Sequence, residues 1–246
     1  MKMTRKILPA IVMLLVSAIM LSTASFAWFA SSTSVEATNM SVKVQSAAKF
    51  MEISQTQSGT YSHSVTAANQ SAVVDLVHAK IDAINKTTVT WYEGESDNPD
   101  SANAGKLTDA DKLTSDDLEA KTYYLKNTFW VKMSSGSTTD LANLKISNVE
   151  VVKTIGEYTG DNLDKALRVL VVGPNGSQLW TNTTGTMALA EGASAFATTV
   201  TKTAQSFDVY VFYDGEDAVA TTNKAVELKG LSVKIAFAAE MPPATP

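Results

Sequence analysis

Hydrophobic and polar residues alternate along several stretches of this chain, and that period of two is typical of half-buried β-strands. The pattern is clearest near the C-terminus, where Phe207, Val209, Val211 and Tyr213 alternate with other residues and 231–237 repeats the pattern. It predicts sheets that pack on one face. Strands are predicted at 35–44, 50–54, 87–92, 122–133, 144–152, 166–172, 178–180, 207–213 and 226–237, while 72–84 fits a helical stripe or a strand.

The predicted strands are bounded by turn-forming residues, and few segments favour helices. Gly173-Pro174-Asn175-Gly176 predicts a tight turn between two strands. We therefore expect an all-β fold, a two-sheet sandwich of jelly-roll type with a long acidic loop and at most one or two short helices. The expected organisation is a single domain at 28–240 with an N-terminal strand segment at 28–46, an acidic excursion at 93–119 and a Pro-rich tail at 241–246.

The N-terminus has the pattern of an export signal. Lys2, Arg5 and Lys6 are followed by no charged residue until Glu36, and most of the residues from 7 to 21 are apolar. A basic region followed by an apolar one is typical of a secretory signal peptide. We therefore predict a signal peptide at 1–27 and a secreted, extracellular or cell-surface protein.

Small residues define the expected cleavage point. Ser25 and Ala27 lie three and one residues before the predicted bond, and Trp28 follows it. An uncleaved membrane anchor is the alternative, since the uncharged stretch at 7–30 has 24 residues and ~20 suffice to span a bilayer. Contact with a membrane is expected only through this segment, and only if it stays uncleaved.

Composition excludes several partners and stabilising devices. The net charge is −5, and cleavage after Ala27 would remove three basic and no acidic residues, which shifts it to −8. A chain this acidic repels nucleic acid, so no nucleic-acid partner is expected. Cysteine is absent, so packing must stabilise the domain without disulfides.

Catalytic chemistry finds little support. The two histidines, His63 and His78, belong to no helical zinc-protease motif, and the absence of cysteine excludes thiol catalysis. Glu93 and Glu95 beside Trp91 would suit glycoside cleavage only if a cleft held the two carboxylates at a defined separation. Solvated charges at a strand end are the simpler interpretation, and we predict that the protein is not an enzyme.

No cofactor is expected, although one cluster suggests calcium. Asp214, Glu216 and Asp217 surround a glycine and would offer hard oxygen ligands. The spacing of a known calcium loop is missing, and a hairpin turn after the preceding strand explains the same residues.

The predicted processing junction and two of the predicted strands resemble those of a known family. The junction Ser25-Phe26-Ala27-Trp28-Phe29, followed by a polar segment and an alternating strand, resembles the start of the TasA and camelysin group of Gram-positive secreted proteins. The strand pattern at 124–129 and 144–149 is similar in architecture. The resemblance implies processing by a dedicated signal peptidase at Ser25, Ala27 and Trp28. Camelysin is described as a protease, but this sequence has no metal motif to support that activity.

The same resemblance implies an assembly mechanism. Some members of the group are subunits of matrix fibres, in which the freed N-terminal segment pairs as a strand with a neighbouring subunit. An open sheet edge offers unpaired backbone groups that an incoming strand can satisfy. Here the candidate donor is the segment at 28–44, with its marker residues Trp28, Phe29, Val35, Met40, Val42 and Val44.

Three functions therefore remain as hypotheses. The first is a structural subunit of an extracellular matrix fibre or surface layer that self-associates by strand addition, as in a biofilm. The second is a glycan-binding or adhesive module that uses exposed rings such as Trp91, Trp130 or Trp180. The third is a secreted hydrolase. The alternative to strand addition is that the strand at 35–44 only completes the sheet of its own chain.

Overall fold

The computed structural model describes most of the predicted strand regions. The described residues are 34–37, 41–46, 51–67, 74–77, 79–81, 89–93, 112–116, 123–135, 140–154, 163–182, 185–192, 195–214 and 231–240. The predicted signal peptide, nearly all of the acidic excursion and the Pro-rich tail lie outside these residues.

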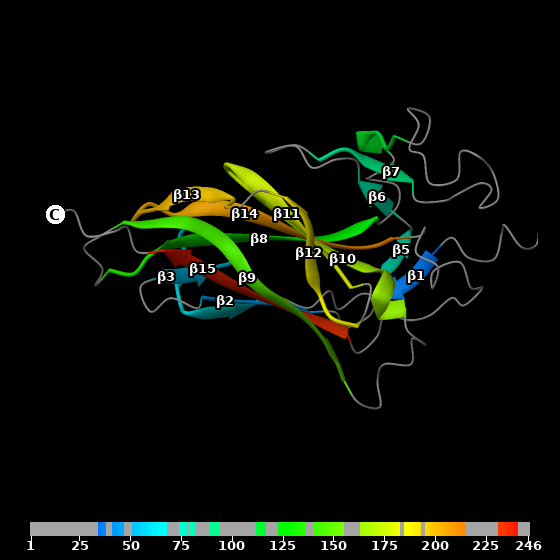
Figure 1. Cartoon of the computed structure of the whole chain (residues 1–246), viewed down its shortest axis with the longest axis horizontal. Helices are drawn as coiled ribbons and strands as arrows, with labels where there is room; N and C mark the ends of the chain where they lie inside the picture. The colour runs from blue at the N-terminus through cyan, green and yellow to red at the C-terminus, as the bar shows by residue number, and fades with distance from the viewer. Residues whose placement is uncertain are drawn as a thin grey trace, which may run out of the picture.

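Two large sheets face each other and form a β-sandwich (Figure 1), as the alternation predicts. The six-stranded sheet has the order β12 (Ala188–Gly192), β11 (Gly176–Thr181), β10 (Leu167–Gly173), β14 (Gln205–Tyr213), β8 (Tyr124–Met133) and β3 (Met51–Ser54). The five-stranded sheet has the order β13 (Ala197–Val200), β9 (Leu141–Lys153), β15 (Leu231–Glu240), β2 (Ser41–Ser46) and β4 (Ser64–Thr66). Every pairing in the two sheets is antiparallel except that of β15 with β2.

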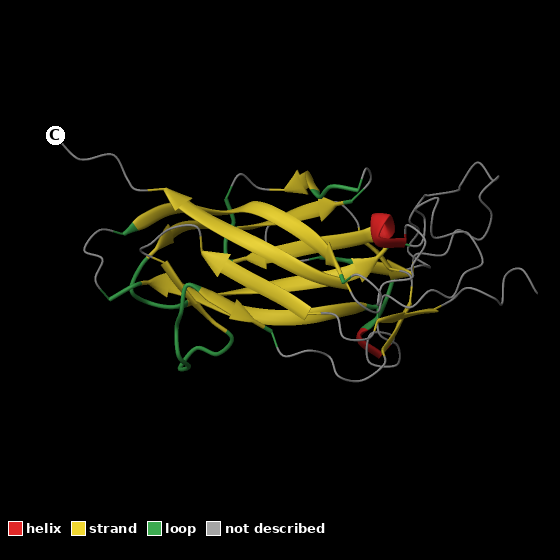
Figure 2. Cartoon of the chain, turned by 90° about the horizontal axis from the view of Figure 1, so that it is seen from below, coloured by secondary structure: helices red, strands yellow, loops and turns green. Residues whose placement is uncertain are grey.

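Smaller elements gather at one end of the sandwich. Two short antiparallel pairs, β1 (Ser34–Ala37) with β5 (Val74–Val77) and β6 (Ala79–Ile81) with β7 (Trp91–Glu93), lie there. The 3-10 turn η2 (Leu163–Ala166) lies at the same end, opposite to the C-terminus (Figure 2).

Phenylalanine side chains from both sheets form the centre of the core. Phe207 of β14 lies 4.6 Å from Phe237 of β15, measured between ring centroids, so this contact joins the two sheets. Phe129 stacks on Phe207 at 5.9 Å, and Phe196 meets Phe237 edge-on at 5.5 Å. Such aromatic pairs add to the stabilisation that burial of their area provides.

A second apolar cluster lies on the outer face of the six-stranded sheet. Trp91 of β7 packs on Tyr124 and Phe212, with ring centroids 4.5 and 5.1 Å apart, respectively. Ala79 of β6 and Leu170 of β10 are fully buried in the same cluster. The small β6–β7 sheet thus buries part of a face that would otherwise meet solvent.

The sequence pattern predicted most of the long strands and missed several short ones. The strands predicted at 50–54, 122–133, 144–152, 166–172, 178–180, 207–213 and 226–237 correspond to β3, β8, β9, β10, β11, β14 and β15. The ambiguous region at 72–84 contains β5 and β6, while β4, β12 and β13 were not predicted.

The predicted turn is confirmed, because Gly173 pairs with Gly176 where β10 meets β11. A side chain at Gly173 would collide with Phe196, since a Cβ there would lie 2.6 Å from its carbonyl oxygen.

We predict that Phe237→Ala lowers the free energy of unfolding by about 3–5 kcal/mol, because it leaves a cavity where the two sheets meet. Urea denaturation measures the loss. Leu189→Ala on β12 is the control, since Leu189 is 48% exposed and truncation there should change stability by no more than about 0.5 kcal/mol. Equal losses in the two variants would contradict this view of the core.

Candidate assembly site

The predicted N-terminal strand at 35–44 is in fact two strands in two different sheets. β1 pairs with β5, and β2 lies between β15 and β4. The expectation of one continuous strand is therefore wrong, because the pairing partner changes between Ala37 and Ser41. Val35 lies on β1, and Val42 and Val44 lie on β2. Trp28, Phe29 and Met40 lie outside the described residues.

β2 is paired on both of its edges. On one side Val42 and Val44 lie opposite Val233 and Ile235 of β15, in parallel register. On the other side Val44 lies opposite Val65 of β4 in antiparallel register. Within the described sheet β4 is joined only through β2, so β2 carries the end of the five-stranded sheet.

The terminal strands β3 and β13 make further hydrogen bonds outside their sheet pairings. The backbone of Ile53 on β3 exchanges two hydrogen bonds with Ser62, with N–O distances of 2.7 and 3.0 Å. Gln205 donates to the carbonyl oxygen of Thr199 on β13 at 3.0 Å. On the terminal strand β12, Leu189 is the one exposed large hydrophobic side chain in the described part of the chain.

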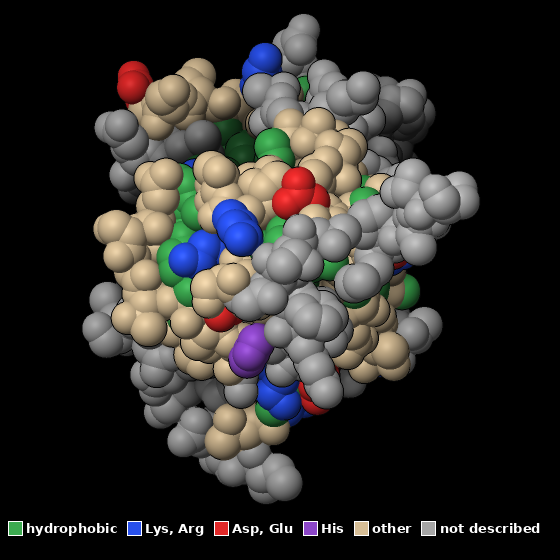
Figure 3. Space-filling view, turned by 90° about the vertical axis from the view of Figure 1, so that its left-hand side faces the viewer, with side chains coloured by type: hydrophobic (Ala, Val, Ile, Leu, Met, Phe, Trp, Pro, Cys, Tyr) green, Lys and Arg blue, Asp and Glu red, His purple; other side chains and the backbone are tan. Residues whose placement is uncertain are grey.

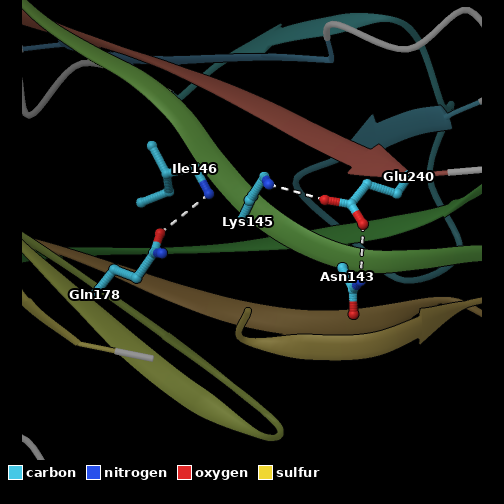
Figure 4. Close-up of polar contacts among 5 residues, drawn as sticks. All are labelled: Asn143, Lys145, Ile146, Gln178 and Glu240. Atoms are coloured by element: carbon cyan, nitrogen blue, oxygen red, sulfur yellow. Dashed lines mark hydrogen bonds and ion pairs between the residues drawn. The ribbon is translucent and has the colours of Figure 1, made fainter. Parts of the chain in front are cut away.

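Gln178 connects the two sheets by a buried hydrogen bond (Figure 4). Its Oε1 atom accepts from the backbone N–H of Ile146 on β9 at 3.1 Å. The pairing of β13 with β9 ends at Ala197 and Leu144, so Gln178 supplies an acceptor just beyond that point. Gln178 is 2% exposed. Without its Oε1 atom the buried backbone N–H of Ile146 would lose its acceptor, and a buried N–H without a partner is costly.

A polar cluster holds the C-terminal end of β15 against β9. Glu240 accepts from Asn143 Nδ2 at 2.8 Å and from Lys145 Nζ at 2.9 Å (Figure 4). The hydrogen bond from Asn143 contributes most to lowering the pKa of Glu240, followed by the hydrogen bond and the charge of Lys145. Asn143 has a left-handed backbone, with φ of 54°, a conformation that asparagine tolerates well.

The calcium hypothesis gains only one placed ligand. Asp214 forms an ion pair with Arg168 at 3.1 Å, so its carboxylate already faces a cation. Glu216 and Asp217 lie outside the described residues. Within the described part of the chain, no three acidic or histidine side chains come together as a metal site would require.

Of the candidate catalytic side chains, the described residues place only that of His63. The Nδ1 atom of His63 lies 3.2 Å from the carbonyl oxygen of Met51, whereas the side chain of His78 is not described. Glu93 ends β7, and Glu95 lies outside the described residues. The pair of carboxylates considered for glycoside cleavage is therefore not placed by the described residues.

The aromatic rings of the glycan hypothesis are mostly buried. Trp91 belongs to the outer cluster at 7% exposure, and Trp180 belongs to the main core at 8%. Trp130 on β8 is half-buried. At the end of the sandwich opposite to η2, the hydrophobic side chains of the described residues show as small patches among backbone, charged side chains and other side chains (Figure 3). Of the three rings, only Trp130 keeps partial access to a ligand.

Two features of this region were not predicted. The exposed Leu189 on β12 lies in a short apolar run between Gly185 and Gly192, which was the only signal of a strand there. Gln178 was predicted as part of a strand, but its inter-sheet hydrogen bond depends on how two distant strands approach each other.

Comparisons with known proteins assign no relative. No protein-family model matches the chain, and the searches of curated proteins and of solved structures found no match. Among the described residues, no helix has the length and apolarity needed to cross a membrane.

We predict that Gln178→Leu destabilises the fold by about 1–3 kcal/mol, because it removes the acceptor of a buried N–H. Hydrogen exchange at the Ile146 amide should become faster in the same variant. The control is Gln57→Leu in an exposed loop, which should shift stability by at most about 0.5 kcal/mol. Unchanged hydrogen exchange at the Ile146 amide would show that the hydrogen bond to Gln178 does not protect this amide.

We also predict that the carboxyl group of Glu240 titrates below the usual pKa of glutamate, as NMR can measure. Because its folded pKa is lowered, its contribution to stability is complete above the pKa of the unfolded chain and is lost as pH falls through the folded value. Lys145→Met should raise the pKa of Glu240, and Lys132→Met should not. Equal titration midpoints for Glu240 in the wild-type protein and the two variants would show that Lys145 does not lower the pKa of Glu240.

Proposed function

We propose that this protein is a secreted structural subunit of an extracellular fibre or surface layer, and that its subunits join by exchange of the N-terminal strand. The observation that carries this proposal is the position of β2. It comes from the N-terminal segment, yet it completes the five-stranded sheet between β15 and β4.

A neighbouring subunit can supply the same pairing. Parallel pairing of β2 with β15 uses backbone hydrogen bonds in a fixed register, and these bonds do not depend on which chain provides the strand. Exchange of an identical element between subunits has a low energetic cost, because the pairing within one chain is replaced by the same pairing between two chains. If each subunit donates to the next, the interface is head-to-tail and extends into a filament.

Processing of the N-terminus favours this exchange. Cleavage after Ala27 would leave a segment of 13 residues, 28–40, before β2 begins at Ser41. A strand close to a free chain end can leave its sheet without threading past other strands. The resemblance of the junction around Trp28 to the TasA and camelysin group supports the same proposal, since members of that group build fibres.

Removal of the donor tests the proposal. We predict that the chain from residue 28 to 246 forms filaments in negative-stain micrographs, and that a variant without residues 28–46 does not. The variant should instead bind a synthetic peptide of residues 28–46, because the edges of β15 and β4 are then open. A peptide of the same composition in scrambled order is the control for this binding.

A second deletion controls for the loss of chain length. Removal of residues 241–246, which follow β15, should leave filament formation intact. If the chain from residue 28 to 246 stays a strict monomer across salt concentration and pH, strand exchange is not its mode of assembly. That outcome does not depend on whether the shortened variant folds.

A further inference from the structure

Three polar side chains meet at the end of the sandwich where η2 lies. Asp164 of η2 accepts from Lys153 Nζ at 2.8 Å through its Oδ2 atom, and the same oxygen lies 3.4 Å from Asn182 Nδ2. Because both nitrogens contact the same oxygen, the distance between Lys153 Nζ and Asn182 Nδ2 is at most the sum of these two distances. Asp164 and Asn182 are each 1% exposed, whereas the side chain of Lys153 is 46% exposed.

The amide of Asn182 is held in a fixed orientation. Its Nδ2 atom also donates to the carbonyl oxygen of Asp164 at 2.9 Å. Its Oδ1 atom is buried and has no hydrogen-bond partner among the described residues. Buried polar atoms are usually satisfied, so an orphaned carbonyl oxygen beside a lysine–carboxylate pair calls for an explanation.

The three residues come from different parts of the fold. Lys153 ends β9 in the five-stranded sheet, and Asn182 directly follows β11 in the six-stranded sheet. A covalent bond between these two side chains would tie one sheet to the other. Since the chain has no cysteine, a disulfide cannot serve this purpose.

We propose that Lys153 and Asn182 form an intramolecular isopeptide bond, with Asp164 as the group that transfers protons. A lysine amine attacks a carbonyl carbon only after it loses a proton, and the buried carboxylate of Asp164 is positioned to accept that proton. The same group, once protonated, lies beside the amide nitrogen that must leave.

The atoms of this step balance without any added reagent. The Nζ atom of Lys153 forms a bond to Cγ of Asn182, and the bond from Cγ to Nδ2 breaks. The ammonium group of Lys153 loses two protons in total, and these leave with Nδ2 as an ammonium ion. Asp164 ends as a carboxylate, and nothing is oxidised or reduced.

Peptide mapping of the intact, secreted chain tests the proposal. Trypsin cannot cleave after a lysine whose amine is in an amide bond, so peptide 146–165 should appear joined to peptide 169–202. The linked pair should be lighter than the sum of the two peptides by the mass of one ammonia molecule. Fragmentation should place the link on Lys153 and Asn182.

Two matched variants control the assignment. Lys153→Arg keeps the positive charge and cannot form the bond, so it should yield separate peptides. Lys145→Arg replaces a lysine of the same strand that faces Glu240, and it should leave the linked pair in place with unchanged peptide boundaries.

Several outcomes would overturn the proposal. Free peptides 146–153 and 169–202 from the folded wild-type chain would show that the three residues form only an ion pair and hydrogen bonds. An internally crosslinked peptide 146–165 that is lighter by one water molecule, with peptide 169–202 free, would show a bond from Lys153 to Asp164 instead. Because the wild-type chain decides the matter, a variant that fails to fold does not weaken the test.

Discussion

The parallel pairing of β2 with β15 is the constraint on which the five-stranded sheet depends. β15 pairs with β9 on its other side, and its buried residues Val233, Ile235 and Phe237 face the second sheet. Without β2, one edge of β15 would carry unpaired backbone groups, and β4 would lose its described neighbour. The N-terminal segment thus completes the sheet that forms one side of the core. Under the proposed function, the same pairing would serve both the completion of the fold and the joining of subunits.

The connection between the two sheets rests on packing and on a few polar contacts. The rings of Phe207 and Phe237 meet at the centre, and the side chain of Gln178 reaches from β11 to the backbone of β9. At the end near η2, Lys153, Asp164 and Asn182 bring the same two sheets together. In a chain without cysteine, these contacts provide the connection that a covalent crosslink often provides. The proposed isopeptide bond would place such a crosslink at one end of the sandwich.

The strength of the local pattern decided what the sequence could predict. β14 and β15 have nine and ten residues, and burial alternates over 206–211 and 231–238, so the faces of these stretches follow from period alone. β4, β12 and β13 have three to five residues, which is too short for alternation to stand out. The change of partner between β1 and β2 was also hidden, because pairing with β5 and β15 is a long-range property.

The candidate site was less predictable still, since nothing in the sequence indicated that Val42 and Val44 would lie in parallel register with β15. Asp214 resembled a metal ligand because of its acidic neighbours, whereas its partner Arg168 comes from a strand far along the chain.

A disulfide trap across β2 and β15 tests the central claim most directly. Lys43 lies opposite Lys234 in the parallel register, and the chain has no cysteine of its own, so Lys43→Cys with Lys234→Cys introduces one defined pair. Neighbouring strands lie close enough for a disulfide to form between such positions. Oxidation of assembled protein should give a ladder of covalent oligomers on a non-reducing gel, because β2 then belongs to the next subunit. If filaments yield only internally crosslinked monomers, each chain keeps its own β2 and strand exchange is excluded.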